Sequence, residues 1–122
     1  MIQLIEMDSQ VSLQEQMELD EGPIVLINTF TVAQEDVDAL ISAWVDDAAL
    51  MKTQPGFIST QLHRGIAGSC TFLNYAIWES VRHFRNAFTN PDFQAHLQNY
   101  PSSATGSPHL FKKLAVPDIC VV

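Results

Sequence analysis

The sequence is poor in basic residues and in long apolar runs, and both shortages limit what the protein can be. Of its 122 residues only 6 are Lys or Arg, against 14 Asp or Glu, which gives a net charge of −8. A surface of this sign repels phosphate backbones, so we expect no nucleic-acid partner. No apolar run approaches the ~20 residues of a membrane span. The N-terminus also lacks a secretion signal, so we expect a cytoplasmic protein without a membrane partner.

Residues that hold metals or cofactors are also scarce. Cys70 and Cys120 have neither the spacing of a metal site nor that of a disulfide framework. The histidines do not pair at ligand spacing (His63, His83, His96 and His109). The chain contains no glycine-rich phosphate loop, no dinucleotide fingerprint and no Gly-x-Ser-x-Gly elbow. We therefore expect neither a metal nor a bound cofactor.

The chain divides at Gly22–Pro23, a strong breaker of regular structure. Residues 1–22 are polar and acidic, and we interpret them as an N-terminal extension that lies on the domain or on a partner subunit. Met1–Met7 favours a short strand, and Val11–Leu19 has weak helical spacing. We expect little of this extension to be buried and the domain to fold without it. The domain then spans residues 23–118, and 119–122 form a tail.

Six segments with clear periodicity follow the breaker. We predict strands at Ile24–Val32, Phe57–Arg64, Thr71–Trp78 and His109–Val116, and helices at Gln34–Thr53 and Glu79–Phe88, the second helix restarting at Asn90–Pro91. The first helix carries an apolar stripe of Val37, Leu40, Ile41, Trp44, Val45, Ala48 and Met51. This order predicts an α+β, ferredoxin-like βαββαβ fold, a four-stranded antiparallel sheet with helices on one face.

The strands are apolar on both faces, although the helices cover only one. The second face would be carried by side chains such as Val25, Ile27, Leu73 and Ile77. Little of the chain remains to cover them, so a second copy packed sheet against sheet is the economical cover. The sequence therefore predicts a homodimer.

Two amides interrupt the apolar strands. Asn28 lies within the first strand, and Asn74 shares one face of the third with Phe72, Ala76 and Trp78. A buried amide without partners costs roughly 1–3 kcal/mol. Each amide therefore either bonds a loop or a buried water, or points into a pocket. In an apolar pocket, amide and indole N–H groups can hold an enolate or phenolate oxygen.

These residues also carry a resemblance. The run Phe72–Ser80 (FLNYAIWES), which follows Gln54–Gly65 (QPGFISTQLHRG), resembles the antibiotic biosynthesis monooxygenase family. The helix pattern that follows is similar too (Phe84, Phe88 and Asn90–Phe93). The resemblance covers about residues 23–117 and implies the dimeric α+β barrel, a homodimer of ferredoxin-like domains.

The resemblance implies a small oxygenase that uses O2 without metal, flavin or haem to convert a phenol or hydroquinone to a quinone. Asn74 and Trp78 match the family's polar pocket residues and are the implied catalytic residues. We expect the aromatic substrate to contact a wider set (Asn28, Phe72, Phe84, Phe88 and His96). The sequence departs from the quinone-forming relatives at Phe84, where they have tyrosine, and near Gln98, where they have arginine.

Two alternatives remain. A haem-degrading branch of the family uses an asparagine that Asn28 matches, but Ala87 stands in place of its tryptophan and His96 lies one residue from its histidine. The other alternative is a dimeric barrel that binds a small molecule without turnover, which the missing tyrosine and arginine favour. Oxygen consumption separates the enzyme from the binding protein, and a haem absorption band identifies the haem branch.

Overall fold

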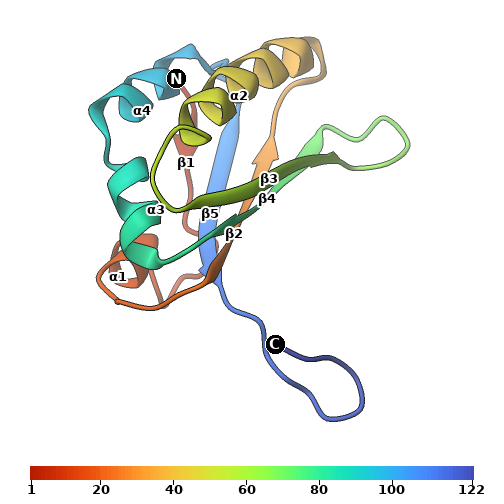
Figure 1. Ribbon diagram of the computed structural model, residues 1–122. Helices are drawn as coiled ribbons and strands as arrows, with labels where there is room; N and C mark the ends of the chain where they lie inside the picture. The colour runs from red at the N-terminus through yellow and green to blue at the C-terminus, as the bar shows by residue number, and fades with distance from the viewer.

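The computed structural model describes residues 1–122 as a twisted sheet with helices on one side (Figure 1). The sheet has five strands in the order β1-β5-β2-β4-β3. The strands are β1 (Gln3–Leu4), β2 (Ile24–Thr31), β3 (Phe57–Arg64), β4 (Thr71–Trp78) and β5 (Thr105–Phe111). Neighbours pair antiparallel except β1, which runs parallel to β5. The predicted α+β, ferredoxin-like fold is confirmed, and β1 adds a fifth strand to the expected sheet.

The helices are α1 (Leu13–Met17), α2 (Val37–Met51) after the 3-10 turn η1 (Gln34–Asp36), α3 (Val81–Phe88) and α4 (Pro91–His96) before the 3-10 turn η2 (Leu97–Asn99). Three of the four α-helices, α1, α3 and α4, begin at a residue whose side chain caps them. Ser80 accepts a hydrogen bond from the His83 N–H and so sets the start of α3. Asn90 caps α4 and Pro91 takes its first position, as the sequence predicts. No helix is long and apolar enough to cross a membrane.

The inner face of α2 differs from the predicted stripe at two positions. Leu40 and Ala43 are buried against the sheet, as the periodicity requires. Val45 belongs to the predicted stripe, but it is exposed in the structure. Asp47 is buried instead, because it follows Ala43 by four residues and therefore lies on the same face.

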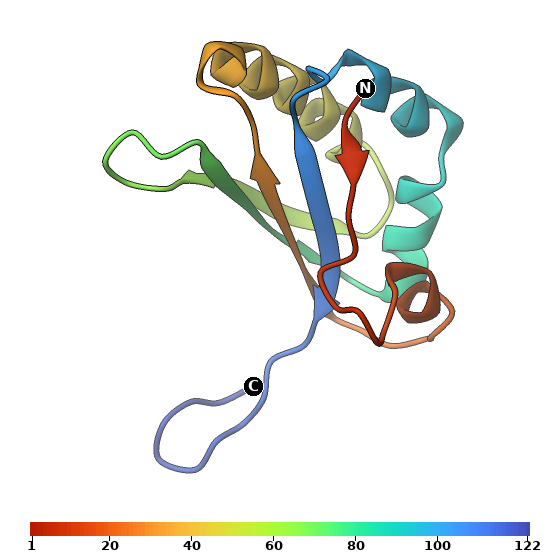
Figure 2. The same cartoon turned by 180° about the vertical axis from the view of Figure 1, so that it is seen from behind.

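The last strand begins and ends earlier than the predicted His109–Val116, at Thr105 and Phe111. β5 pairs with β2 along its whole length, with Leu110 opposite Leu26. β1 separates from β5 after Gly106. The Gly106 carbonyl accepts the last hydrogen bond between the two segments, from the Ile5 N–H. Pro108 therefore lies beside an open edge, where a residue without an N–H is tolerated. The chain after β5 projects away from the body of the molecule (Figures 1 and 2).

The N-terminal extension packs more closely than predicted. Ile2, Leu13 and Met17 are buried in the core, so the expectation that little of this segment is buried is wrong. Figure 2 shows β1 beside β5 and α1 below it. The Gln16 amide pairs with both backbone groups of Leu110 at 2.9 Å, as a neighbouring strand would. One helical turn gives too little periodicity to reveal this packing from sequence.

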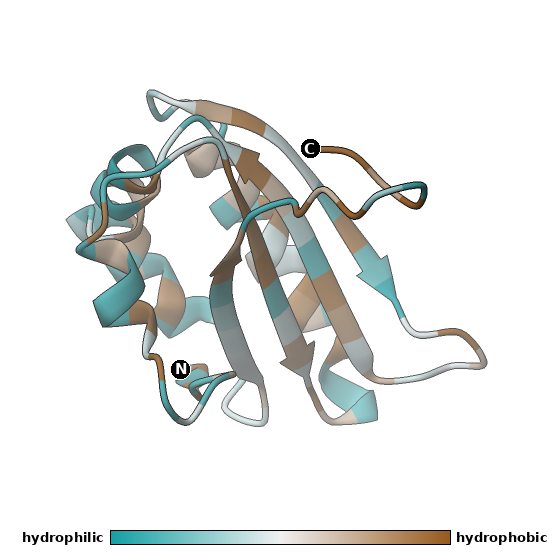
Figure 3. Cartoon of the chain, turned by 90° about the horizontal axis from the view of Figure 1, so that it is seen from below, coloured by the Kyte–Doolittle hydropathy of each residue, from teal (hydrophilic) through white to brown (hydrophobic).

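The opposite face of the sheet carries hydrophobic side chains without a helix of this chain over them. Ile27, Leu73 and Ile77 are half-buried, and Tyr75 and Phe111 are exposed. Figure 3 shows hydrophobic segments recurring along these strands. This is the face that the sequence analysis assigned to a second copy of the chain.

Candidate active site

An apolar cavity lies between the sheet and the helices. It separates two core clusters, one around Leu40 and Phe72 and the other around Trp78 and Phe84. Its empty volume, counted with its mouth, is about 700 Å³, and 15 of its 20 lining residues are hydrophobic. The polar residues in its wall are few (Asn28, Asp47, Thr60 and Asn74).

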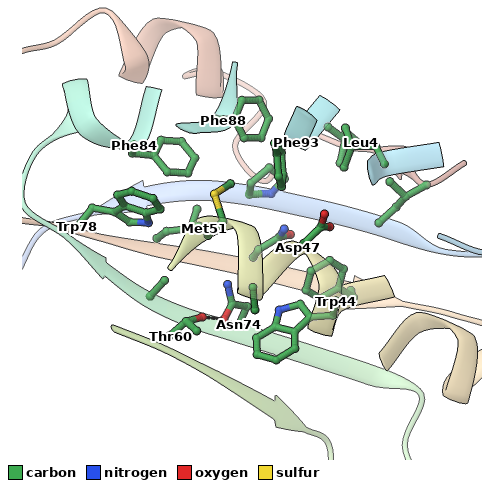
Figure 4. A pocket seen from close by; sticks show the side chains of 18 of the residues that line it. Leu4, Trp44, Asp47, Met51, Thr60, Asn74, Trp78, Phe84, Phe88 and Phe93 are labelled. Carbon is green, nitrogen blue, oxygen red and sulfur yellow. Dashed lines mark hydrogen bonds between the residues drawn. The ribbon is translucent and has the colours of Figure 1, made fainter. Parts of the chain in front are cut away.

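Asn74 presents its amide nitrogen to this cavity. It lies in the middle of β4, and its Oδ1 accepts a hydrogen bond of 2.6 Å from the Thr60 hydroxyl on β3. In this orientation Nδ2 makes no hydrogen bond within the chain. Figure 4 shows Nδ2 turned away from Thr60. The N–H groups of Asn74 are therefore free for a ligand.

Asn28 repeats this arrangement on the neighbouring strand. Its Oδ1 accepts the backbone N–H of Ser107 at 2.9 Å, which leaves its Nδ2 without a partner in the chain. Asn28 and Asn74 stand directly opposite each other in the β2–β4 ladder. Two amides thus line the cavity side by side, each with its oxygen already bonded.

Trp78 carries a third free donor. Its side chain is 1 % exposed, and its indole Nε1 is buried without any hydrogen-bond partner. The ring is held edge-to-face by Phe57 and Phe84, at centroid distances of 5.5 and 6.0 Å. A buried N–H without a partner is destabilising unless something binds to it. Trp78 lines the cavity, so a ligand there can accept this hydrogen bond.

Five of the seven site residues named from the sequence line this one cavity (Asn28, Asn74, Trp78, Phe84 and Phe88). Phe72 does not: it lies on the predicted face of β4 but is buried in the core cluster around Leu40, with the Arg64 guanidinium 5.3 Å from its ring centre. His96 does not line the cavity either. Its Nδ1 lies 3.0 Å from Oδ1 of Asp47, which does line it.

Sequence reasoning missed the two ionisable residues of the cavity wall, Asp47 and Tyr100. The signal for Asp47 was a carboxylate at helical spacing from Leu40 and Ala43, on an otherwise apolar face. Tyr100 gave no periodic signal, because it follows the short turn η2. Ile2 and Leu4 of the extension also line the cavity and were not anticipated.

Burial is the main cause of the pKa shifts of the two ionisable residues in this wall. It raises the pKa of the Asp47 carboxyl above its ordinary value, and hydrogen bonding to Tyr100 and the nearby His96 only partly oppose this effect. Burial, reinforced by the Asp47 charge, also holds the pKa of the Tyr100 phenol far above its ordinary value. Tyr100 therefore remains a neutral hydroxyl, whereas Asp47 holds a proton more readily than a surface aspartate does.

The two departures from the quinone-forming pattern have different consequences. Phe84 lines the cavity beside Trp78 without a hydroxyl, and Tyr100 supplies a hydroxyl from another wall. Gln98 is exposed and its amide nitrogen lies 3.5 Å from the Met1 sulfur, outside the cavity. No Lys or Arg lines the cavity, so an anion bound there is held by neutral donors.

A protein-family comparison decides the affiliation of the chain. Residues 23–99 match the model for antibiotic biosynthesis monooxygenase, which is more than half of the chain. The chain belongs to the antibiotic biosynthesis monooxygenase family. This confirms the resemblance carried by Phe72–Ser80.

Individual relatives agree with the family. The chain is 28% identical over 93 residues to deoxynogalonate monooxygenase of Streptomyces nogalater, covering 76% of this chain and 78% of that protein. The structure of SnoaB, a cofactor-independent oxygenase from the same organism, is similar with a TM-score of 0.68 at 25% identity. A Shewanella loihica PV-4 protein with a provisional monooxygenase description gives 0.68 at 30% identity. Both structural matches cover 80% of this chain and 99% of the other.

Proposed function

We propose that this family member is a cofactor-independent monooxygenase that oxidises a small, electron-rich aromatic, a phenol or hydroquinone, to a quinone with O2. Membership of the monooxygenase family supports the reaction class. The similarity to SnoaB, a cofactor-independent oxygenase, supports the absence of a redox cofactor. The cavity supports the substrate class, because it is apolar and carries only a few oriented donors.

The free donors on β4 carry this proposal. The Trp78 indole N–H is buried without a partner, and the Asn74 amide N–H groups lie on the same wall of the cavity. Both are neutral and fixed, so they stabilise negative charge on a bound oxygen without reorganising. A phenolate oxygen placed against them gains the hydrogen bonds that the folded protein leaves unmade.

The proposed reaction balances without any other oxidant. The phenol loses its hydroxyl proton, and the phenolate transfers one electron to O2. The resulting radical pair combines to form a carbon–oxygen bond, which gives a peroxide at the para carbon. The C–H bond at that carbon and the O–O bond then break, so that a quinone and one water leave. The protein binds the anion, excludes bulk water and holds the developing charge.

Two other functions remain as outcomes of the test. The missing tyrosine at Phe84 and the exposed Gln98 favour a barrel that binds an aromatic without turnover. Haem degradation needs a histidine that reaches the metal, and His96 is instead engaged with Asp47 outside the cavity lining. We therefore rank haem chemistry below the oxygenase.

Oxygen uptake tests the proposal. Protein that has been analysed for metal, flavin and haem is incubated with a panel of phenols and hydroquinones. We expect O2 consumption that depends on protein and a quinone product identified by its mass. Tight binding of the same compounds without O2 consumption would establish the binding protein instead.

We also propose a cytoplasmic homodimer that packs through the open face of the sheet. The half-buried Ile27, Leu73 and Ile77 on this face support it, since a second copy would cover them. Sedimentation at micromolar concentration should give twice the chain mass. Ile77→Lys should produce a folded monomer, whereas a stable wild-type monomer would contradict the interface.

A further inference from the structure

One charged side chain lines the otherwise neutral cavity. Asp47 is 5 % exposed and lies on the inner face of α2. No other Asp or Glu, and no Lys, Arg or His, is among the residues that line the cavity. Figure 4 shows the Asp47 carboxylate between Phe93 and Trp44, on the helical side, whereas Asn74 and Trp78 lie on the strand side. A substrate in the cavity therefore meets donors from β4 and one carboxylate from α2.

Two residues that come later in the chain, His96 and Tyr100, hold the Asp47 carboxylate in place. His96 on α4 places its Nδ1 3.0 Å from Asp47 Oδ1, and the His96 side chain is 33 % exposed. The Tyr100 hydroxyl, just after η2, lies beside the same carboxylate. The only further charge that acts on it is the exposed Asp46 on its own helix. The Asp47–His96 pair thus extends from the cavity wall to the partly exposed His96 side chain.

We propose that Asp47 is the general base that takes the hydroxyl proton of the substrate, and that His96 is a positioning residue that holds its carboxylate. This inference rests on the proposed function. The phenol O–H bond breaks, its proton bonds to a carboxylate oxygen of Asp47, and the electron pair stays on the phenol oxygen. After the carbon–oxygen bond to O2 has formed, Asp47 returns this proton to the terminal peroxide oxygen, and quinone and water form as above.

Burial suits Asp47 to this role. Its pKa is raised, so it is a stronger base than an exposed aspartate. Once protonated it is neutral, so it does not repel the phenolate and can donate a hydrogen bond to it. Tyr100 stays protonated, because burial keeps its pKa far above the ordinary value, and it does not compete for the proton. The acid–base group missing at Phe84 is thus supplied from α2.

A purely structural ion pair between α2 and α4 is the competing explanation, and substrate acidity separates the two. Wild type, Asp47→Asn and His96→Gln are assayed for O2 uptake with phenols whose hydroxyl pKa lies above or below the assay pH. Asp38→Asn is the matched control, because Asp38 is exposed on the same helix and its charge does not act on Asp47. Thermal unfolding of each variant is measured alongside.

General-base catalysis predicts a loss that depends on the substrate. Asp47→Asn should lose about 10²- to 10⁴-fold in kcat/KM on phenols that are un-ionised in solution. Most of this loss should disappear on phenols that are already ionised. Wild-type kcat/KM should fall at acid pH as Asp47 is protonated. This acid limb of the pH profile should be absent in Asp47→Asn and displaced in His96→Gln. Asp38→Asn should match wild type.

The contradicting outcomes are distinguishable. Equal losses on both classes of phenol, or no loss on either, would overturn Asp47 as the base while leaving the oxygenase intact. An unfolded Asp47→Asn together with an unshifted pH profile in His96→Gln would make the pair structural. No O2 uptake by wild type on any phenol would overturn the proposed function, and the base with it.

Discussion

Asn28 and Asn74 are cross-strand partners at the centre of the β2–β4 ladder. Each has its amide oxygen bonded to a neighbouring strand, Asn28 to the Ser107 N–H on β5 and Asn74 to the Thr60 hydroxyl on β3. The sheet therefore uses both oxygens to orient both amides, and leaves their N–H groups for the cavity. Both side chains are half-buried, and their unpaired N–H groups contribute no hydrogen bond to the fold.

Asn74→Leu removes one free donor while nearly preserving its shape. If Asn74 stabilises charge in the transition state, kcat should fall by about 10²- to 10³-fold, or about 2.7–4 kcal/mol. The melting temperature should change little, because Thr60 is half-buried and can find another partner. Steady-state oxygen uptake and thermal unfolding measure the two effects. A sharply lower melting temperature with unchanged uptake per folded protein would make Asn74 a structural amide.

Thr60→Val is the matched control for orientation. It removes the hydroxyl that bonds Asn74 Oδ1 at 2.6 Å but leaves the amide in place. The amide can then turn over, so we expect a loss of kcat smaller than that of Asn74→Leu. A loss equal to that of Asn74→Leu would mean that the fixed orientation, rather than the presence of the amide, carries the effect.

Trp78→Phe removes the buried indole N–H and keeps an aromatic ring between Phe57 and Phe84. We expect a decrease of about tenfold in kcat, less than for Asn74→Leu, because the amide donors remain. Trp44→Phe makes the same chemical change at the other tryptophan of the cavity wall and should leave kcat near wild type. Equal losses in the two variants would point to cavity shape and not to the Trp78 N–H.

The N-terminal extension should stabilise the fold, contrary to what its polar composition indicates. Leu13 and Met17 are buried in the core cluster that contains Trp78. Leu13→Ala and Met17→Ala should each lower the free energy of unfolding by about 2–5 kcal/mol, measured by urea denaturation. Glu18→Ala, at an exposed neighbour, is the control. If all three variants match wild type, the extension is dispensable, as the sequence analysis expected.

Asp47 should destabilise the folded state at neutral pH. Burial raises its pKa in the folded protein above the ordinary value of 3.8, so folding favours the protonated form. Its contribution to stability is therefore present below pH 3.8 and is lost as the pH rises through the folded value. Asp47→Asn should be more stable than wild type at neutral pH, and the difference should shrink in acid. A variant less stable at pH 7 would show that the ion pair with His96 dominates.

Much of the fold could be predicted from local chemistry. The bounds of β3 and β4 follow from β-rich runs, and the breaks around α4 follow from Asn90 and Pro91. The first part of β5 could not be predicted, because Gly106 and Pro108 are typical of a loop. Pro108 is tolerated because β1 covers only the first residues of β5, a fact of tertiary pairing that no window of the sequence contains.

The candidate site divides in the same way. Asn74 and Trp78 could be found because strand parity puts them on one face, and amides among apolar residues are conspicuous. Phe72 shares that parity but lies outside the cavity, since parity gives the face and not the position along it. Asp47 could have been found on the apolar face of α2. Its contact with His96 joins residues 49 positions apart in the sequence, so that only the fold reveals it.

Oxygen uptake by wild type and Asn74→Leu, each free of metal, flavin and haem, tests the central claim most directly. The claim is that the neutral donors of Asn74 and Trp78 stabilise the phenolate that reacts with O2. It predicts uptake with quinone formation by wild type, and a loss of about 10²- to 10³-fold in a variant that melts at the same temperature. Equal uptake by the two proteins, or none by wild type across the whole panel of phenols, would contradict it.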